Sequence, residues 1–105
     1  MTSLEKLRAV AGPLGLTVAE SDDGDHAINL SSGMTVAAYC PDTNSIGVDD
    51  SRDGYAFGHD PRDPTDARAI RRAIAAGALQ VALGRFFPED KAAAKALLAR
   101  ILEQA

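Results

Sequence analysis

The spacing of hydrophobic residues changes twice along this 105-residue chain, and these changes restrict the fold more than any other feature. Residues 4–14 carry leucines at the three- and four-residue spacing of a helix. Between Leu16 and Phe57 hydrophobic residues recur at every second position, and helical spacing returns after Asp63. Because strands have a side-chain period of two and helices of 3.6, we expect helix, then strands, then helices again.

The first helix is bounded by recognisable signals. Thr2 and Glu5 have the spacing of a capping box, in which each residue's side chain bonds the other's backbone N–H. Leu4, Leu7, Val10 or Ala11, and Leu14 form its apolar stripe. Gly12-Pro13 should end the helix, because proline lacks an N–H donor and disfavours helical geometry in the preceding residue.

Two further helices are expected near the C-terminus. Asp63 is the predicted N-cap of the first, Pro64 its first residue and Gly84 its C-cap. Its apolar stripe is predicted to comprise Ile70, Ile74, Gly77, Ala78 and Val81, widened by Leu79 and Leu83. The last helix opens with Glu89 and Asp90, and its predicted buried stripe is Leu97, Leu98, Ile101 and Leu102.

Short strands separated by turn residues fill the middle of the chain. They are expected at 16–19, 26–31, 34–40, 46–48 and 55–57, with Ser32-Gly33 as a two-residue hairpin turn. In the third strand Met34, Val36, Ala38 and Cys40 should share one face, with Thr35, Ala37 and Tyr39 on the other. The prediction is one α+β domain over 1–105: a two-layer fold with an antiparallel meander of four to five strands, in the order αββββ(β)αα.

Composition narrows the functional classes. Hydrophobic residues make up 46% of the chain and charged residues 25%, as in globular domains. The single cysteine, Cys40, excludes an intramolecular disulfide and favours a reducing, cytoplasmic location. No segment has the length and hydropathy of a membrane span or a signal peptide, so we expect a soluble protein. A net charge of −4 argues against direct nucleic-acid binding.

Charge is distributed unevenly. Eleven acidic and two basic residues lie between Glu20 and Asp66, whereas seven basic and three acidic residues follow Ala67. Arg68, Arg71 and Arg72 have the spacing of one helix side, where they form either an anion or acidic-partner site or an ordinary solvated face.

The acidic residues concentrate in predicted turns. In a meander alternate turns lie at the same end of the sheet, so one end should carry Asp22, Asp23, Asp25 and Asp42. The other end should carry Asp49, Asp50 and Asp53. Aspartate is also common in turns for conformational reasons alone.

Residues 49–60 partly match a calcium-binding loop. Asp49, Ser51, Asp53, Gly54 and Asp60 occupy positions one, three, five, six and twelve of that pattern. Phe57 at position nine supplies no oxygen ligand, position twelve lacks the usual glutamate, and no helices flank the segment. A plain turn is therefore the favoured interpretation, and we predict no metal or cofactor.

Catalytic groups are scarce. His26, His59 and Cys40 have no spacing that indicates a triad or a zinc site. We therefore expect a non-enzymatic protein-binding module, such as an inhibitor, an immunity-type protein or a nucleic-acid mimic, whose acidic loops bind a partner with a basic surface. The partner-binding candidates are the seven aspartates of the two sheet ends together with Arg68, Arg71 and Arg72.

One alternative is a self-associating structural subunit, such as a homodimer, using the exposed sheet face (Ala27, Ala37, Tyr39 and Ala56) or the Phe86-Phe87 joint. Another is a weak calcium- or small-ligand-binding domain using residues 49–60.

Overall fold

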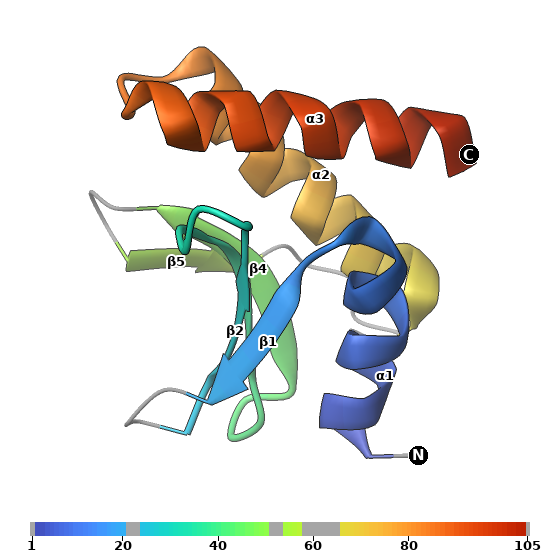
Figure 1. Ribbon diagram of the computed structural model, residues 1–105. Helices are drawn as coiled ribbons and strands as arrows, with labels where there is room; N and C mark the ends of the chain where they lie inside the picture. Colours follow the sequence, from blue (N-terminus) through green and yellow to red (C-terminus); the bar gives the residue numbers. More distant parts are fainter. Residues whose placement is uncertain (1, 21–23, 51–53, 58–65, 105) are drawn as a thin grey trace.

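Helices precede and follow a run of consecutive strands in the computed structural model, which describes residues 2–20, 24–50, 54–57 and 66–104 (Figure 1). The elements are α1 (Ser3–Ala11), a 3-10 turn η1 (Gly12–Leu14), β1 (Thr17–Glu20), β2 (His26–Asn29), β3 (Thr35–Cys40), β4 (Ser45–Asp50), β5 (Gly54–Phe57), α2 (Ala67–Leu83) and α3 (Pro88–Gln104). This order confirms the predicted α+β class, with five strands in the sheet.

Helix α1 begins and ends where its signals predict. The Thr2 side chain accepts a hydrogen bond of 3.2 Å from the Glu5 backbone N–H, and Leu7 and Ala11 are buried. At Gly12-Pro13 the α-helix gives way to η1. Gly15 follows with a φ of 77°, in the left-handed region that glycine tolerates, and the chain then enters β1.

The sheet is an antiparallel meander in which each strand pairs with its neighbours in sequence, in the order β1-β2-β3-β4-β5. The turn between β2 and β3 differs from the prediction. Leu30 and Met34 are joined by a hydrogen bond of 2.8 Å, so the loop holds three residues, Ser31 to Gly33, and not two. Gly33 takes a φ of 96°, as a three-residue hairpin with a left-handed glycine requires.

A bulge in β3 overturns the predicted faces of that strand. Asn29 pairs with Thr35 but Ile28 pairs with Ala37, so Val36 is an extra residue. Because a bulge shifts the alternation by one position, the helix-facing side changes from Val36 to Ala37 and then Tyr39. Ala37 is 0% and Tyr39 3% exposed, and both belong to the core, contrary to the outward placement expected from strict alternation.

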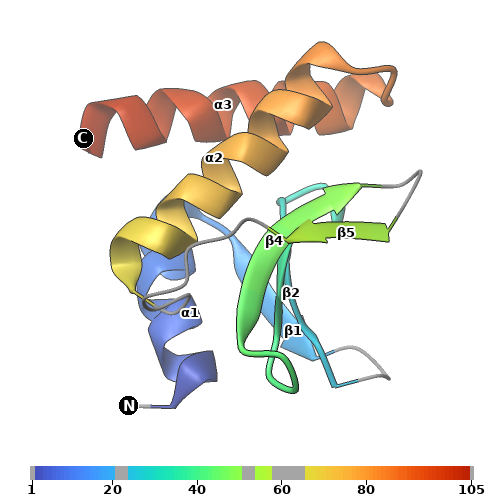
Figure 2. The same ribbon diagram turned by 180° about the vertical axis from the view of Figure 1, so that it is seen from behind.

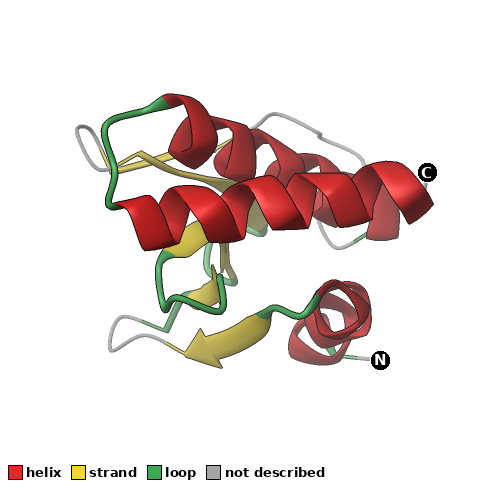
Figure 3. Cartoon of the chain, turned by 45° about the horizontal axis from the view of Figure 1, so that its top comes forward, coloured by secondary structure: helices red, strands yellow, loops and turns green. Residues whose placement is uncertain are grey.

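The helices cover one face of the sheet. Helix α2 packs on β3 and β4, α1 packs on β1 and α2, and α3 packs mainly on α2 (Figures 1 and 2). In Figure 3 α3 runs in front of the other elements, with α1 below its C-terminal half. The largest fully buried side chains come from α1, α2 and two strands of the sheet: Leu7, Ile28, Ile70, Ile74 and Val36.

The stripe of α2 is confirmed, but its widening residues are not buried. Leu79 is 48% and Leu83 82% exposed. In α3 the contact stripe contains Ala94, Leu97 and the partly buried Ile101, whereas Leu102 is 75% exposed. Leu102 is one residue past Ile101 and therefore points about 100° further around the helix axis.

Asp66 is the N-cap of α2, in extended geometry and with no hydrogen bond from its side chain to the backbone of the helix. The predicted start at Asp63 and Pro64 lies outside the described residues. Gly84 occupies the predicted C-cap, and its N–H donates to the Gln80 carbonyl over 3.0 Å.

Gly77 lets α2 approach the sheet unusually closely. A Cβ atom at this position would overlap the Val36 carbonyl oxygen and lie 2.8 Å from the Val36 carbonyl carbon. Both obstacles are backbone atoms at the bulge, which cannot rotate away as a side-chain end could. The absence of a side chain at position 77 is thus a packing requirement of the helix–sheet interface.

We expect Gly77→Ala to destabilise the fold although alanine is the better helix former. Helix propensity should contribute about 1 kcal/mol in favour. Overpacking against backbone should cost about 3 kcal/mol, and the net loss should lower the melting temperature by roughly 10 °C. Thermal unfolding followed by circular dichroism measures the shift.

Gly12→Ala is the matched control, because a Cβ at Gly12 has no atom within 4 Å and the residue has right-handed helical geometry. Its melting temperature should stay within about 2 °C of the wild type, the range of ordinary surface substitutions. Equal melting temperatures for the Gly77 and Gly12 variants would contradict the proposed role of the close contact.

Candidate functional site

A groove between α2 and α3 gathers the three arginines that the sequence singled out. Its walls are formed by Arg68, Arg71, Arg72 and Ala75 of α2 and by Ile101 and Gln104 of α3. The groove encloses about 540 Å³ and is open to solvent. All three arginines are exposed, while Ala75 and Ile101 are half-buried. We call this set of six residues the arginine groove.

The positions of the arginines follow from helical geometry. Residues 68, 71 and 72 lie at spacings of three and four, so they share one side of α2. A neighbouring stripe of the same helix, formed by Ile70, Ile74 and Ala78, is buried in the core. With that stripe buried, the arginine side remains exposed next to α3, whose Ile101 and Gln104 complete the groove.

The electrostatic setting of the groove is positive. Within the described part of the chain, none of the three arginines makes an ion pair or a side-chain hydrogen bond. They lie in the first two turns of α2, where the helix dipole adds positive potential. Among the described residues, the acidic residues nearest to the groove in sequence are Asp66, two positions before Arg68, and Glu103, which precedes Gln104; both are exposed.

This arrangement suits an anionic ligand with some apolar surface. A guanidinium can donate two parallel N–H bonds to one carboxylate or phosphate, which makes arginine the preferred residue for such recognition. Ile101 and Ala75, both half-buried, add apolar surface to the lining. The groove therefore combines charged and apolar groups.

The predicted acidic residues are divided by the sheet topology. Asp25 precedes β2 and Asp42 lies in the turn between β3 and β4, so both belong to one end of the meander. Asp49 and Asp50 end β4 at the opposite end. Asp22, Asp23 and Asp53 lie outside the described residues. The meander thus keeps the two acidic groups apart, as the strand order predicts.

The segment that resembles a calcium loop contains a β-hairpin pairing. Asp49 pairs with Tyr55 and Asp50 with Gly54, so the first two and the sixth to ninth positions of the pattern belong to strands. Residues 51–53 and 58–60 lie outside the described residues. The described residues contain no group of three or more His, Cys, Asp or Glu side chains that could hold a metal ion.

His26 lies against Tyr39, its cross-strand partner. The two rings are stacked with centroids 6.0 Å apart and planes at 18°. His26 Nδ1 is buried and has no hydrogen-bond partner among the described residues. The Tyr39 hydroxyl accepts from Ser3 Oγ over 3.4 Å and donates to Asn44 Oδ1 over 2.5 Å. These contacts supply no base–nucleophile pair of the kind that covalent catalysis uses, and His59 lies outside the described residues.

Sequence reasoning found the arginines but not the residues opposite them. Helical spacing predicts only that Ile101 belongs to a buried stripe. It does not predict that Ala75 or Gln104 lines a groove. No signal in the sequence could have identified them, because the pairing of α2 with α3 depends on how two helix surfaces fit together.

No family model, curated protein or solved structure matches this chain. The candidate site therefore stands on the geometry and chemistry described above. In the part of the chain that the structure describes, no helix has the length and apolar character needed to cross a membrane.

Proposed function

We propose that this chain is a non-enzymatic protein-binding module whose arginine groove binds an acidic segment of a partner protein. The observation that carries the proposal is that three exposed arginines line one groove together with the half-buried Ile101 and Ala75. A protein segment with carboxylates and an aliphatic residue matches both features. A small inorganic anion would use only the charge.

The electrostatics of the whole chain favours a protein over nucleic acid as the ligand. The chain carries a net charge of −4, so the chain as a whole repels a polyanion, and seven of its eleven basic residues follow Ala67. A short acidic segment can occupy the groove without approaching the acidic turns. Its affinity should fall as salt rises, because exposed ion pairs are screened.

Replacing the arginines should weaken binding of an acidic peptide. The probe is a fluorescein-labelled Glu-Glu-Leu-Glu-Glu-Leu peptide, followed by fluorescence anisotropy at low salt. The variant R68Q/R71Q/R72Q should bind it about thirtyfold more weakly, since three exposed pairs at about 0.7 kcal/mol each sum to roughly 2 kcal/mol.

A matched control removes three exposed positive charges elsewhere, in the variant R8Q/R85Q/K95Q. It has the same net charge as the groove variant. It should bind the peptide within about threefold of the wild type, because exposed charges outside the groove contribute little to the binding free energy. Equal weakening in both variants would contradict a specific groove. Preferential binding of a single-stranded oligonucleotide would contradict a protein partner.

The acidic turns give the same module a second charged surface. We propose that the end of the sheet with the Asp25 and Asp42 turns binds a partner with a basic surface. Support comes from the meander, which places the Asp25 and Asp42 turns at a common end, with Asp42 exposed. This surface would serve an inhibitor, an immunity-type protein or a nucleic-acid mimic. Its long-range attraction would act mainly on the association rate.

Two variants with equal charge changes test this surface. D25N/D42N alters one end of the sheet and D49N/D50N the other. With a labelled oligolysine peptide at low salt, the first variant should bind about tenfold more weakly than the second, as expected when two ion pairs with the peptide, at about 0.7 kcal/mol each, are lost at one end only. Equal affinities would show that net charge alone attracts the peptide and would contradict a docking surface.

Self-association is the second candidate function, and of the two surfaces expected for it we propose the joint between α2 and α3. The sheet face is not available as predicted, because Ala37 and Tyr39 are buried under the helices. The joint between α2 and α3, however, exposes Leu83 by 82% and Phe87 by 74%. Leu83 and Phe87 are four positions apart in sequence, and large exposed apolar side chains are a common feature of interaction surfaces.

Sedimentation velocity over a wide concentration range tests the joint. The wild type should form a dimer that the variant L83S/F87S loses. L102S removes a leucine of similar exposure, 75%, at the other end of α3 and should leave the dimer intact. A wild type that stays monomeric at all concentrations would contradict this candidate.

A further inference from the structure

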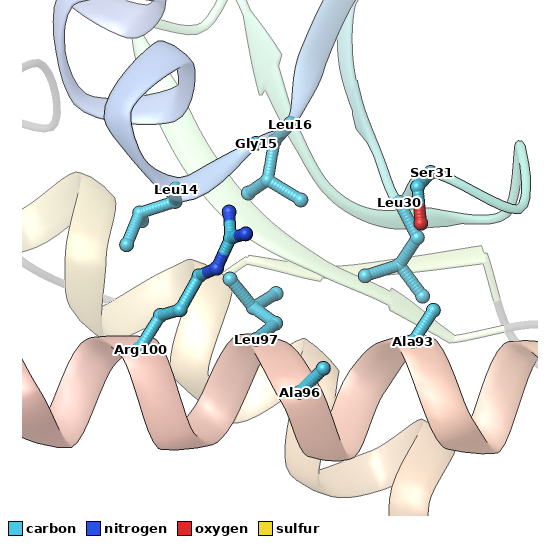
Figure 4. A pocket seen from close by; sticks show the side chains of 9 residues that line it. All are labelled: Leu14, Gly15, Leu16, Leu30, Ser31, Ala93, Ala96, Leu97 and Arg100. Atoms are coloured by element: carbon cyan, nitrogen blue, oxygen red, sulfur yellow. The ribbon is translucent and has the colours of Figure 1, made fainter.

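A second cavity lies between α3 and the loops that flank β1 and β2, separate from the arginine groove. It encloses about 240 Å³ and is half open to solvent (Figure 4). Its lining residues come from η1 and the following loop, from the end of β2 and from α3: Leu14, Gly15, Leu16, Leu30, Ser31, Ala93, Ala96, Leu97 and Arg100. The two cavities share no residue.

Four leucines contribute to the lining of this cavity. Leu14, Leu30 and Leu97 are each 3% exposed, and Leu16 is 8% exposed. The side chains of Leu16, Leu30 and Leu97 point into the space between the loops and α3 (Figure 4). Ser31 and Arg100 add polar groups to the same lining. The mixed lining therefore suits a small ligand that carries both a hydrocarbon part and a polar group.

One cationic group lies at the edge of the aliphatic lining. The Arg100 side chain rises from α3 and its guanidinium lies between Leu14 and Gly15 (Figure 4). A Cβ on Gly15 would lie 2.6 Å from Arg100 Nη1, so the guanidinium rests directly against the glycine backbone. Among the described residues Arg100 has no ion-pair or hydrogen-bond partner. A charged donor is thus available beside an apolar space.

We propose that this cavity binds a small aliphatic monocarboxylate, with its carboxylate on the Arg100 guanidinium and its hydrocarbon chain among Leu14, Leu16, Leu30 and Leu97. A guanidinium pairs with a carboxylate through two parallel N–H bonds. The hydroxyl of Ser31, at the other side of the cavity, is exposed. This inference does not depend on the proposed protein-binding function.

The size of the cavity limits the ligand. A dry cavity of about 150 Å³ accommodates benzene, and pockets for drug-sized ligands begin at about 300 Å³. At about 240 Å³ this cavity suits a chain of about six carbons. Acetate is too short to fill the aliphatic part, and a long fatty acid exceeds it.

Sodium hexanoate is the probe, titrated into the ¹⁵N-labelled protein and followed by backbone amide chemical shifts. We expect saturable shifts in residues 14–16, 30–31 and 93–100. Hexanol should bind about tenfold more weakly because it lacks the charge-assisted bond. Acetate should give no saturable shifts, because it lacks the hydrocarbon chain.

Paired variants locate the two recognition elements. R100Q should weaken hexanoate binding about tenfold and leave hexanol binding unchanged, whereas K95Q, which removes an exposed charge from the same helix, should change neither. A96L should abolish binding of both ligands by filling the cavity. A99L is its control, because Ala99 is exposed on α3 and does not line the cavity.

Three results would overturn the proposal. The first is equal affinity for hexanoate and hexanol in the wild type, which would remove the role of the guanidinium. The second is unchanged hexanoate binding in both R100Q and A96L. The third is loss of hexanoate binding in R68Q/R71Q/R72Q with retention in R100Q, which would place the anion in the arginine groove.

Discussion

The contact between Gly77 of α2 and the backbone of Val36 in β3 is the constraint on which the arrangement of the helices depends. It lets the helix and the sheet meet backbone to backbone, closer than two layers of side chains would allow. Val36 is also the bulged residue, so the closest approach of α2 occurs where β3 changes its inward face. With α2 held there, its arginine side is directed toward α3, and the groove between the helices results.

Local signals predicted the elements well, because each depends on residues near one another in sequence. The capping residue Thr2, the helix-ending Pro13 and the turn residue Asn44, which takes a φ of 49°, act within a few positions. The faces of β3 could not be predicted in the same way. A single extra residue at Val36 reverses every later side chain, and a period-two pattern of small hydrophobic residues fits either assignment.

In the candidate sites, too, features within one helix could be predicted from the sequence, whereas contacts between elements could not. Arg68, Arg71 and Arg72 could be placed together from the sequence because one helix carries all three. Ile101 could not be assigned to the same groove, since that requires knowing which side of α3 meets α2. The contact of Arg100 with Gly15 joins residues that are 85 positions apart in the sequence. Neither the residue types nor their spacing predicts this contact. The prediction that Leu102 is buried was wrong for a related reason. Helical spacing defines an apolar stripe, but the neighbouring element determines how much of that stripe is buried.

The meander has a consequence for how the chain is made. Every strand pairs only with strands adjacent to it in sequence, so the sheet can form from contacts between nearby residues while the chain is still being synthesised. The helix that covers it, α2, is completed only at Leu83. Until then Ile28, Tyr39 and Ile46 lie uncovered on a newly formed sheet. The nascent chain therefore passes through a stage with an open apolar surface, and the speed with which α2 follows determines how long that surface remains exposed to other chains.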